Sequence, residues 1–467
     1  MALLCGKPFH IISLLRFSKF IRTKNKEMKN SPRPFRRFVL LSLFLFIGAL
    51  SGTAHAQASG NDRGMAFTML EMTKDAIKKN YFDPSFRGID VDFVFEQAKE
   101  RIKVAPTRDA MMITIASAVL AFDDSHTTFV PPSRAADIEY GWIVSMVGDD
   151  AFVTQVKPGS DAETKGLKPG DKLLAIDGFK PTRKNLWQMY YRYFTVAPTS
   201  KVSMTVLSPG TTAPRVLEIQ TKIAKTAKVK SIQEWYDRGT IKHGWEDNDK
   251  IDEFKQFGSD LLIWKMHTFV RSDSSVDSAM AKARGCKTLI LDLRGNRGGI
   301  VDIEERLTGY FFDKDVKIGD LKTRKETKER VAKTRGGGVF TGDLIVLVDS
   351  NSASAAEVFA KVIQLQKRGK IIGDGSAGAV MTSKFFDMDS GIGNYLFFGA
   401  SITIGDLIMT DGKSLEKVGV TPDEIVRPTA QDLATSKDPV LAYAAKLAGI
   451  DITPEQAGAF FPFEWPK

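Results

Sequence analysis

The sequence predicts a multidomain α/β protein with an N-terminal helical region, a β-rich module and a core of alternating strands and helices. Its 467 residues exceed what a single hydrophobic core usually holds. Apolar residues recur at helical spacing over 62–120, short alternating strands with Gly-rich turns occupy 137–223, and strand and helix patterns alternate over 258–430. The apolar share of 43% and charged share of 26% are ordinary for a globular protein.

Residues 1–56 are predicted to be a leader. The chain carries a net charge of +10, and these residues hold ten basic side chains and one acidic, so residues 57–467 carry about +1. From Met28 a basic stretch leads into an apolar run and a small-x-small signal ending at Ala56. The run is shorter than the roughly 20 residues of a membrane span. We therefore expect a signal peptide, with a membrane anchor as the alternative, and an exported chain in the bacterial periplasm or medium with no nucleic-acid partner.

Cysteine usage argues against disulfide, zinc or thiol chemistry. Only Cys5 and Cys286 occur, so the chain after the leader has a single Cys and no internal disulfide. Cys286 stands at the entry to an apolar strand, where it is expected to be a core residue. No Cys/His cluster has zinc-ligand spacing, and we expect no metal and no organic cofactor.

The first folded region, residues 57–136, is expected to be helical. The run "TRDAMMITIASAVLAF" starts at a Thr that can cap a helix, and its apolar residues repeat at helical spacing. The region ends in "FDDSHTTF", which contains His126, one of only three histidines after residue 56.

Residues 137–223 carry the pattern "KPGSDAETKGLKPGDKLLAIDGFKP" between predicted strands, and this stretch resembles a PDZ domain. The resemblance implies that an extended peptide adds to a sheet edge and that backbone N–H groups hold its carboxylate. The carboxylate loop would be Tyr140, Gly141, Trp142 and Ile143. The alternative is that the module only packs on its neighbour.

Three segments complete the predicted organisation. Residues 224–257 are polar and charged, which indicates a linker or insertion. Residues 258–430 are expected to form the α/β core, whose functional loops gather at strand ends. Residues 431–467 are predicted to be a C-terminal helical tail.

Two loops of the core have the composition of a catalytic centre. In "LIVLVDSNSASAAEVFAKVI", Ser354 stands between a buried strand and a helix N-terminus, where helix N–H groups can stabilise negative charge. The alternative is that Ser352 and Ser354 only cap the helix. In "LILDLRGNRGG", glycines let backbone N–H groups approach a ligand closely, as an oxyanion hole requires.

Taken together, "DLRGNRGG" and, about 55 residues later, "NSASAAEVFA" downstream of a PDZ-like segment resemble the tail-specific, C-terminal-processing serine peptidases and their tricorn-core relatives. The resemblance implies a crotonase/ClpP-like β/α spiral core with Ser354 as the nucleophile. It also implies an oxyanion hole formed by backbone N–H groups of Gly298 or Gly299 and Ala355.

The general base is where the sequence departs from the Ser–Lys branch of this family. That branch has a Lys in a Gly-Lys-Gly turn, and here "GDGSAGAV" has Ala379 instead, which leaves Lys384 as an alternative base. The tricorn-like branch implies His126 as the base, oriented by Glu416, with Asp411 as a competitor for the orienting role. Ser125 is expected to steady the ring or the oxyanion.

The expected function is therefore that of an exported serine endopeptidase whose PDZ domain captures protein or peptide substrates, including C-terminal tails. An acyl-CoA enzyme on the same kind of core is disfavoured by export and by the PDZ module. The alternative is a catalytically inactive peptidase fold that acts as a peptide-binding scaffold.

Overall fold

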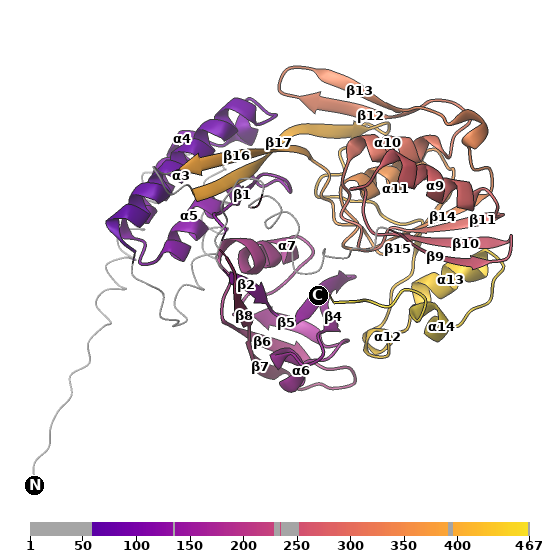
Figure 1. The fold of residues 1–467 in the computed structure, drawn as a ribbon, viewed down its shortest axis with the longest axis horizontal. Coiled ribbons are helices and arrows are strands. Elements are labelled where there is room, and N and C mark those ends of the chain that lie inside the picture. Colours follow the sequence, from indigo (N-terminus) through magenta and orange to yellow (C-terminus); the bar gives the residue numbers. More distant parts are fainter. Residues whose placement is uncertain (1–57, 134–135, 228–233, 235–251, 391–395, 466–467) are drawn as a thin grey trace, which may run out of the picture.

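The computed structural model describes residues 58–133, 136–227, 234, 252–390 and 396–465 (Figure 1). The predicted leader lies outside the described residues, as does most of the predicted linker. Within the described ranges, every helix is too short or too polar to cross a lipid bilayer.

The predicted N-terminal helical region is a bundle of three α-helices. They are α3 (Gly60–Asn80), α4 (Val91–Val104) and α5 (Arg108–Leu120). Each begins where a side chain accepts a hydrogen bond from the first turn, and the three capping residues are Ser59, Asp90 and Thr107. The buried faces of the helices share one apolar cluster.

The β-rich module is a five-stranded sheet in sequence order. Its strands are β3 (Trp142–Val147), β4 (Asp150–Val156), β5 (Lys172–Ile176), β6 (Lys201–Leu207) and β7 (Arg215–Gln220). Strand β3 therefore lies at an edge of the sheet. The short helix α7 (Leu186–Tyr190), which continues as a π-helical turn to Val196, contacts this edge.

The core is a six-stranded sheet in the order β18-β15-β14-β11-β10-β9. Its strands are β9 (Asp252–Phe257), β10 (Leu261–Met266), β11 (Thr288–Asp292), β14 (Asp343–Val348), β15 (Lys370–Gly373) and β18 (Glu424–Ile425). All pairs are parallel except β9 with β10. One face packs on α9 (Asp273–Ala283), α10 (Val301–Gly309) and α11 (Ala355–Leu365). The other packs on α13 (Pro439–Leu447) and α14 (Pro454–Gly458).

A second sheet joins the helical region to the core. The long strand β17 (Leu396–Met409) pairs with β1 (Thr128–Val130), β12 (Val316–Thr323) and β16 (Thr382–Ser390), and β12 pairs with β13 (Thr327–Ala332). Phe398 and Ile402 on β17 pack on the helical bundle, whereas Leu407 and Met409 pack on the core. Strands β16 and β17 extend from the helices towards the core in Figure 1. This strand brings the loop after α5 next to the core.

The predicted multidomain α/β architecture is confirmed, with differences at both ends of the range expected to be a linker. At its start, strand β8 (Lys222–Lys225) pairs with β2 (Ala136–Glu139). At its end, residues 252–257 form strand β9, which pairs along its whole length with β10. The strand is polar because it lies at the sheet edge and is only partly buried.

Candidate active site

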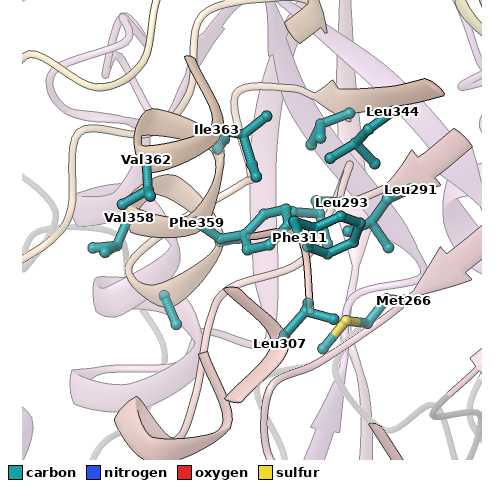
Figure 2. Close-up of a cluster of buried hydrophobic side chains, with 14 of the residues drawn as sticks. Met266, Leu291, Leu293, Leu307, Phe311, Leu344, Val358, Phe359, Val362 and Ile363 are labelled. Carbon is teal, nitrogen blue, oxygen red and sulfur yellow. The ribbon is translucent and has the colours of Figure 1, made fainter. Parts of the chain in front are cut away.

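The core places Ser354 at the N-terminus of α11. Phe359 and Ile363 of this helix are fully buried with Phe311 of the neighbouring chain segment, which fixes the helix against the sheet (Figure 2). Ser354 has φ +56° and ψ −121°, a conformation that non-glycine residues rarely adopt. Such strain costs about 1–3 kcal/mol and is typical of functional positions. The helix dipole adds partial positive charge beside the hydroxyl.

The Gly-rich loop lies directly against Ser354. A Cβ on Gly298 would come within 2.7 Å of Ser354 Cβ and 2.8 Å of Ala355 N. The Gly298 amide donates to Asn296 Oδ1 at 2.8 Å. Among the described residues, no hydrogen-bond acceptor is paired with the Gly299 or Ala355 amide. These two amides can therefore donate to an oxyanion.

His126 lies at the start of a hydrogen-bonded relay. Its Nδ1 is 2.7 Å from Ser125 Oγ, and Ser125 Oγ donates to Glu416 Oε2 at 2.8 Å. The single hydroxyl hydrogen of Ser125 is thus given to the carboxylate, so Nδ1 must carry a proton and donate to Oγ. Glu416 Oε1 accepts a further hydrogen bond from the Ser125 amide at 2.8 Å. Nε2 of His126 is then the unprotonated nitrogen, as a general base requires.

One turn connects this relay to Ser354. Ala379 accepts a hydrogen bond from the Ser354 amide at 2.8 Å, and the next residue, Val380, donates to Glu416 Oε2 at 3.2 Å. In the described chain, no hydrogen bond joins Ser354 Oγ to His126. Catalytic contacts of this kind commonly tighten only when substrate binds.

Buried Asp124 holds the histidine loop in place. Its carboxylate accepts hydrogen bonds from the backbone of His126 and Thr127 and from the hydroxyls of Tyr81 and Thr403. Tyr81 ends α3 and Thr403 belongs to β17, so this carboxylate fixes the loop to the bundle and to the second sheet.

Burial shifts the pKa values of both His126 and Glu416, the two ends of the relay. Burial lowers the pKa of His126 below its ordinary 6.5, against the opposing charge of Asp124. Burial raises the pKa of the Glu416 carboxyl, while its hydrogen bonds from Ser125 and Val380 act in the other direction. The imidazole is therefore in its base form at neutral pH.

We expect an NMR titration to show His126 protonating only below pH 6.5. Protein spanning 57–467 with ¹³C-labelled histidine and the Ser354→Ala change, which prevents self-cleavage, has only three histidine signals to assign. The His126→Gln variant identifies the signal. A midpoint above 6.5 would contradict the inferred environment of the ring.

The structure does not bring the competing residues into the relay. Lys384 lies exposed on β16, with Nζ over the Phe386 ring at 5.7 Å from its centroid. Asp411 pairs with Lys361 at 3.6 Å, and His267 bonds Glu253 at 2.9 Å. His243 lies outside the described residues.

The predicted carboxylate loop is buried. Tyr140, Trp142 and Ile143 are each at most 5% exposed, and Gly141 has φ +75° with Ser160 against it. One residue further along β3, the Val144 amide donates to the Tyr190 hydroxyl at 2.7 Å.

The same Tyr190 hydroxyl donates to the Val144 carbonyl at 2.6 Å. The backbone groups that an added strand would use at Val144 are thus occupied by the α7 side chain. The role of Tyr190 cannot be predicted from the sequence, because nothing local distinguishes this residue among the aromatic residues of "WQMYYRYF".

The β-rich module also contacts the loop before Ser354 directly. Ser350 Oγ donates to the Met146 carbonyl at 2.7 Å, and Asn351 Nδ2 donates to Ser145 Oγ at 3.0 Å. Met146 and Ser145 belong to β3, so the edge strand of the module and the loop before Ser354 form one interface.

A serine at a strained helix N-terminus beside a Gly-rich loop, in a chain that also orients an imidazole through a carboxylate, is typical of acyl transfer, so fold and site define a serine hydrolase. Over the described residues, no group of three or more His, Cys, Asp or Glu side chains is placed to hold a metal ion. Residues 254–426 match the model of peptidase family S41, and residues 136–207 match that of the PDZ domain. The chain is therefore a serine peptidase with a core region that matches family S41 and a PDZ domain.

Similar proteins agree with this assignment. The chain is 22% identical to the carboxyl-terminal-processing protease of Synechocystis sp. over 430 residues, which span 88% of this chain and 93% of that protein. It is 24% identical to the carboxy-terminal processing protease CtpA of Bacillus subtilis over 395 residues, spanning 82% and 74% of the two chains. Its fold resembles that of mature CPAF, with a TM-score of 0.60 at 12% identity, covering 80% of this chain and 95% of the other.

Proposed function

We propose that this chain is an exported endopeptidase that cleaves polypeptides through an acyl-enzyme on Ser354, with His126 as the general base. The observation that carries the proposal is the relay from His126 Nδ1 through Ser125 Oγ to Glu416. Without it, neither the tautomer nor the orientation of the ring would be defined.

The reaction follows from this geometry. His126 Nε2 takes the proton of Ser354 Oγ as the oxygen bonds to the peptide carbonyl carbon, and the Gly299 and Ala355 amides donate to the oxyanion. The imidazolium then gives its proton to the leaving amine as the C–N bond breaks. Water, deprotonated by the same ring, hydrolyses the ester and restores the Ser354 hydroxyl.

The alternative function is that of a catalytically inactive peptide-binding scaffold. The complete hydrogen-bonded relay from His126 to Glu416 argues against this alternative. A chain that does not catalyse a reaction need not retain a strained Ser354, the unpaired Gly299 and Ala355 amides and a buried Glu416 carboxylate that accepts from Ser125.

Export rests on the leader sequence, which predicts that N-terminal sequencing of the secreted protein will begin at Gln57. A start before Ala56 would contradict it.

We further propose that the substrate is captured by its C-terminal tail, since the relatives are carboxyl-terminal-processing proteases and the PDZ edge strand β3 lies beside the nucleophile loop. The Tyr190 hydroxyl occupies the backbone amide and carbonyl of Val144 at the edge of β3. A peptide can add as a strand there only after these two hydrogen bonds break. The stretch from Tyr140 to Val144 would then bind both the C-terminal carboxylate of the substrate and its added strand.

The test compares binding of fluorescein-labelled alanine-rich decapeptides ending in Val, Leu, Phe or Ala, each with a free or an amidated C-terminus, to the Ser354→Ala protein with and without Tyr190→Phe. We expect free carboxylates to bind more tightly, and Tyr190→Phe to tighten binding about fivefold or more, because two hydrogen bonds no longer need to be broken. Equal binding of free and amidated peptides would contradict tail capture. Equal binding to both proteins would contradict closure by Tyr190.

A further inference from the structure

Glu357, on the first turn of α11, has a fully buried carboxylate that accepts four hydrogen bonds. Oε1 accepts from Ser376 Oγ at 2.6 Å and from the Gly378 amide at 2.7 Å. Oε2 accepts from the Ala379 amide at 2.9 Å and from the Ser354 amide at 3.0 Å. All four donors are neutral, so the carboxylate itself is the centre of this cluster.

These bonds join the nucleophile to the turn of residues 376–380. In the same turn, the Ala379 carbonyl accepts a hydrogen bond from the Ser354 amide, and the Val380 amide donates one to the Glu416 carboxylate. Ser376 Oγ, which donates to Glu357, also accepts from the Val420 amide at 2.6 Å, four residues beyond Glu416. Glu357 therefore contacts both the strained backbone of Ser354 and the segment that carries the end of the relay.

We propose that Glu357 is a positioning residue whose ionised carboxylate holds Ser354 and the 376–380 turn at the separation the relay needs. The role rests on the proposed catalytic functions of Ser354, His126 and Glu416. Glu357 acts through its neighbours, since its carboxylate is buried behind the Ser354 backbone. In the Ser–Lys pattern this turn supplies the base itself, whereas here Ala379 supplies only backbone atoms to Ser354 and Glu357.

The charge state of Glu357 matters because each oxygen already faces two donors. A proton on either oxygen would leave one donor without an acceptor, and the turn or Ser354 would have to move. Burial raises the pKa of Glu357 to about 7, while its hydrogen bonds from Ser376, Ala379, Gly378 and Ser354 act against that rise. The donors facing it from α11 and from the turn carry no charge, and the titratable group held by the same turn is Glu416. Above about pH 7 the ionised Glu357 carboxylate thus keeps its hydrogen bonds to Ser354 and to the 376–380 turn, and below that pH its protonation weakens them.

The experiment measures kcat and KM for peptide hydrolysis, and the rate of fluorophosphonate labelling, in Glu357→Gln and Glu357→Asp from pH 5 to 9. We expect Glu357→Gln to lower kcat at pH 8 by about 10-fold or more with KM within about twofold, because its NH₂ group meets donors. The fall of wild-type activity near pH 7 should disappear in this variant, leaving only the step below 6.5. Glu357→Asp, which keeps the charge, should recover part of the rate.

Glu304→Gln is the matched control. Glu304 is equally buried on α10, burial raises its pKa to about 7, and it bonds Thr308 and Arg330 away from the site. We expect Glu304→Gln to lower the stability of the fold while the fall of activity near pH 7 is retained. A Glu357→Gln rate that falls only as far as that of Glu304→Gln would overturn the proposal.

If Glu357→Gln does not fold, Ser376→Ala removes one of the four donors in a milder change. Slower labelling with the wild-type unfolding temperature would support the positioning role, and wild-type labelling would contradict it. A wild-type chain that never labels overturns the proposed function and this role with it. A wild-type chain that labels while both Glu357 variants match it overturns this role alone.

Discussion

Replacing His126 with alanine is expected to lower kcat/KM for peptide hydrolysis by about 10³-fold or more, whereas Lys384→Ala should stay within about twofold of wild type. The relay leaves Nε2 of His126 unprotonated and ready to accept the Ser354 proton. The Lys384 ammonium is exposed over the Phe386 ring and belongs to no hydrogen bond of the relay among the described residues.

Ser125→Ala is a variant of intermediate expected effect in the same experiment. It removes the bridge to Glu416 but leaves the imidazole, so its activity should fall between that of wild type and that of His126→Ala. Initial rates on one peptide at pH 8, with thermal unfolding measured for each variant, separate chemistry from folding. Loss of activity in Lys384→Ala with activity retained in His126→Ala would move the base to the lysine.

Gly298→Ala is expected to lower kcat by about 100-fold or more. The new Cβ would lie 2.7 Å from Ser354 Cβ and 2.8 Å from the Ala353 carbonyl oxygen and Ala355 N. These are backbone or Cβ atoms that cannot rotate away, so the Gly-rich loop must move and the Gly299 and Ala355 amides no longer converge. The alanine would also have to adopt φ +89°.

Gly295→Ala is the control in the same loop. Its φ is +76°, so the strain is similar, but nothing lies within 4 Å of an added Cβ. It should lose stability, by about 1–2 kcal/mol, and keep most of its activity. If Gly298→Ala retains activity comparable to Gly295→Ala, the oxyanion loop does not need this close approach.

The main features of fold and site were open to prediction because they depend on local chemistry. A serine after an apolar strand and before a helix marks a helix N-terminus wherever it occurs, and α11 starts at the residue after Ser354. Glycines whose backbone must approach another chain segment, such as Gly298, are equally local signals. Residues 62–120 showed helical spacing, and three helices lie there.

What could not be predicted depends on contacts between distant segments. Ser125 and Glu416 are 291 residues apart in sequence, and no local pattern says that the carboxylate reaches the ring through the serine hydroxyl. The sequence of strand β9 predicts a linker, because an edge strand needs no apolar alternation. The Tyr190 contact with Val144 depends on how a short helix packs against one strand.

The catalytic role of Ser354 is tested most directly by mass spectrometry of the 57–467 protein after treatment with a fluorophosphonate probe at pH 8. We expect a single adduct on the peptide containing Ser354, absent from both Ser354→Ala and His126→Ala and present in Lys384→Ala. A folded wild-type protein that forms no adduct, or forms one elsewhere, would contradict the claim that Ser354 is a nucleophile activated by His126.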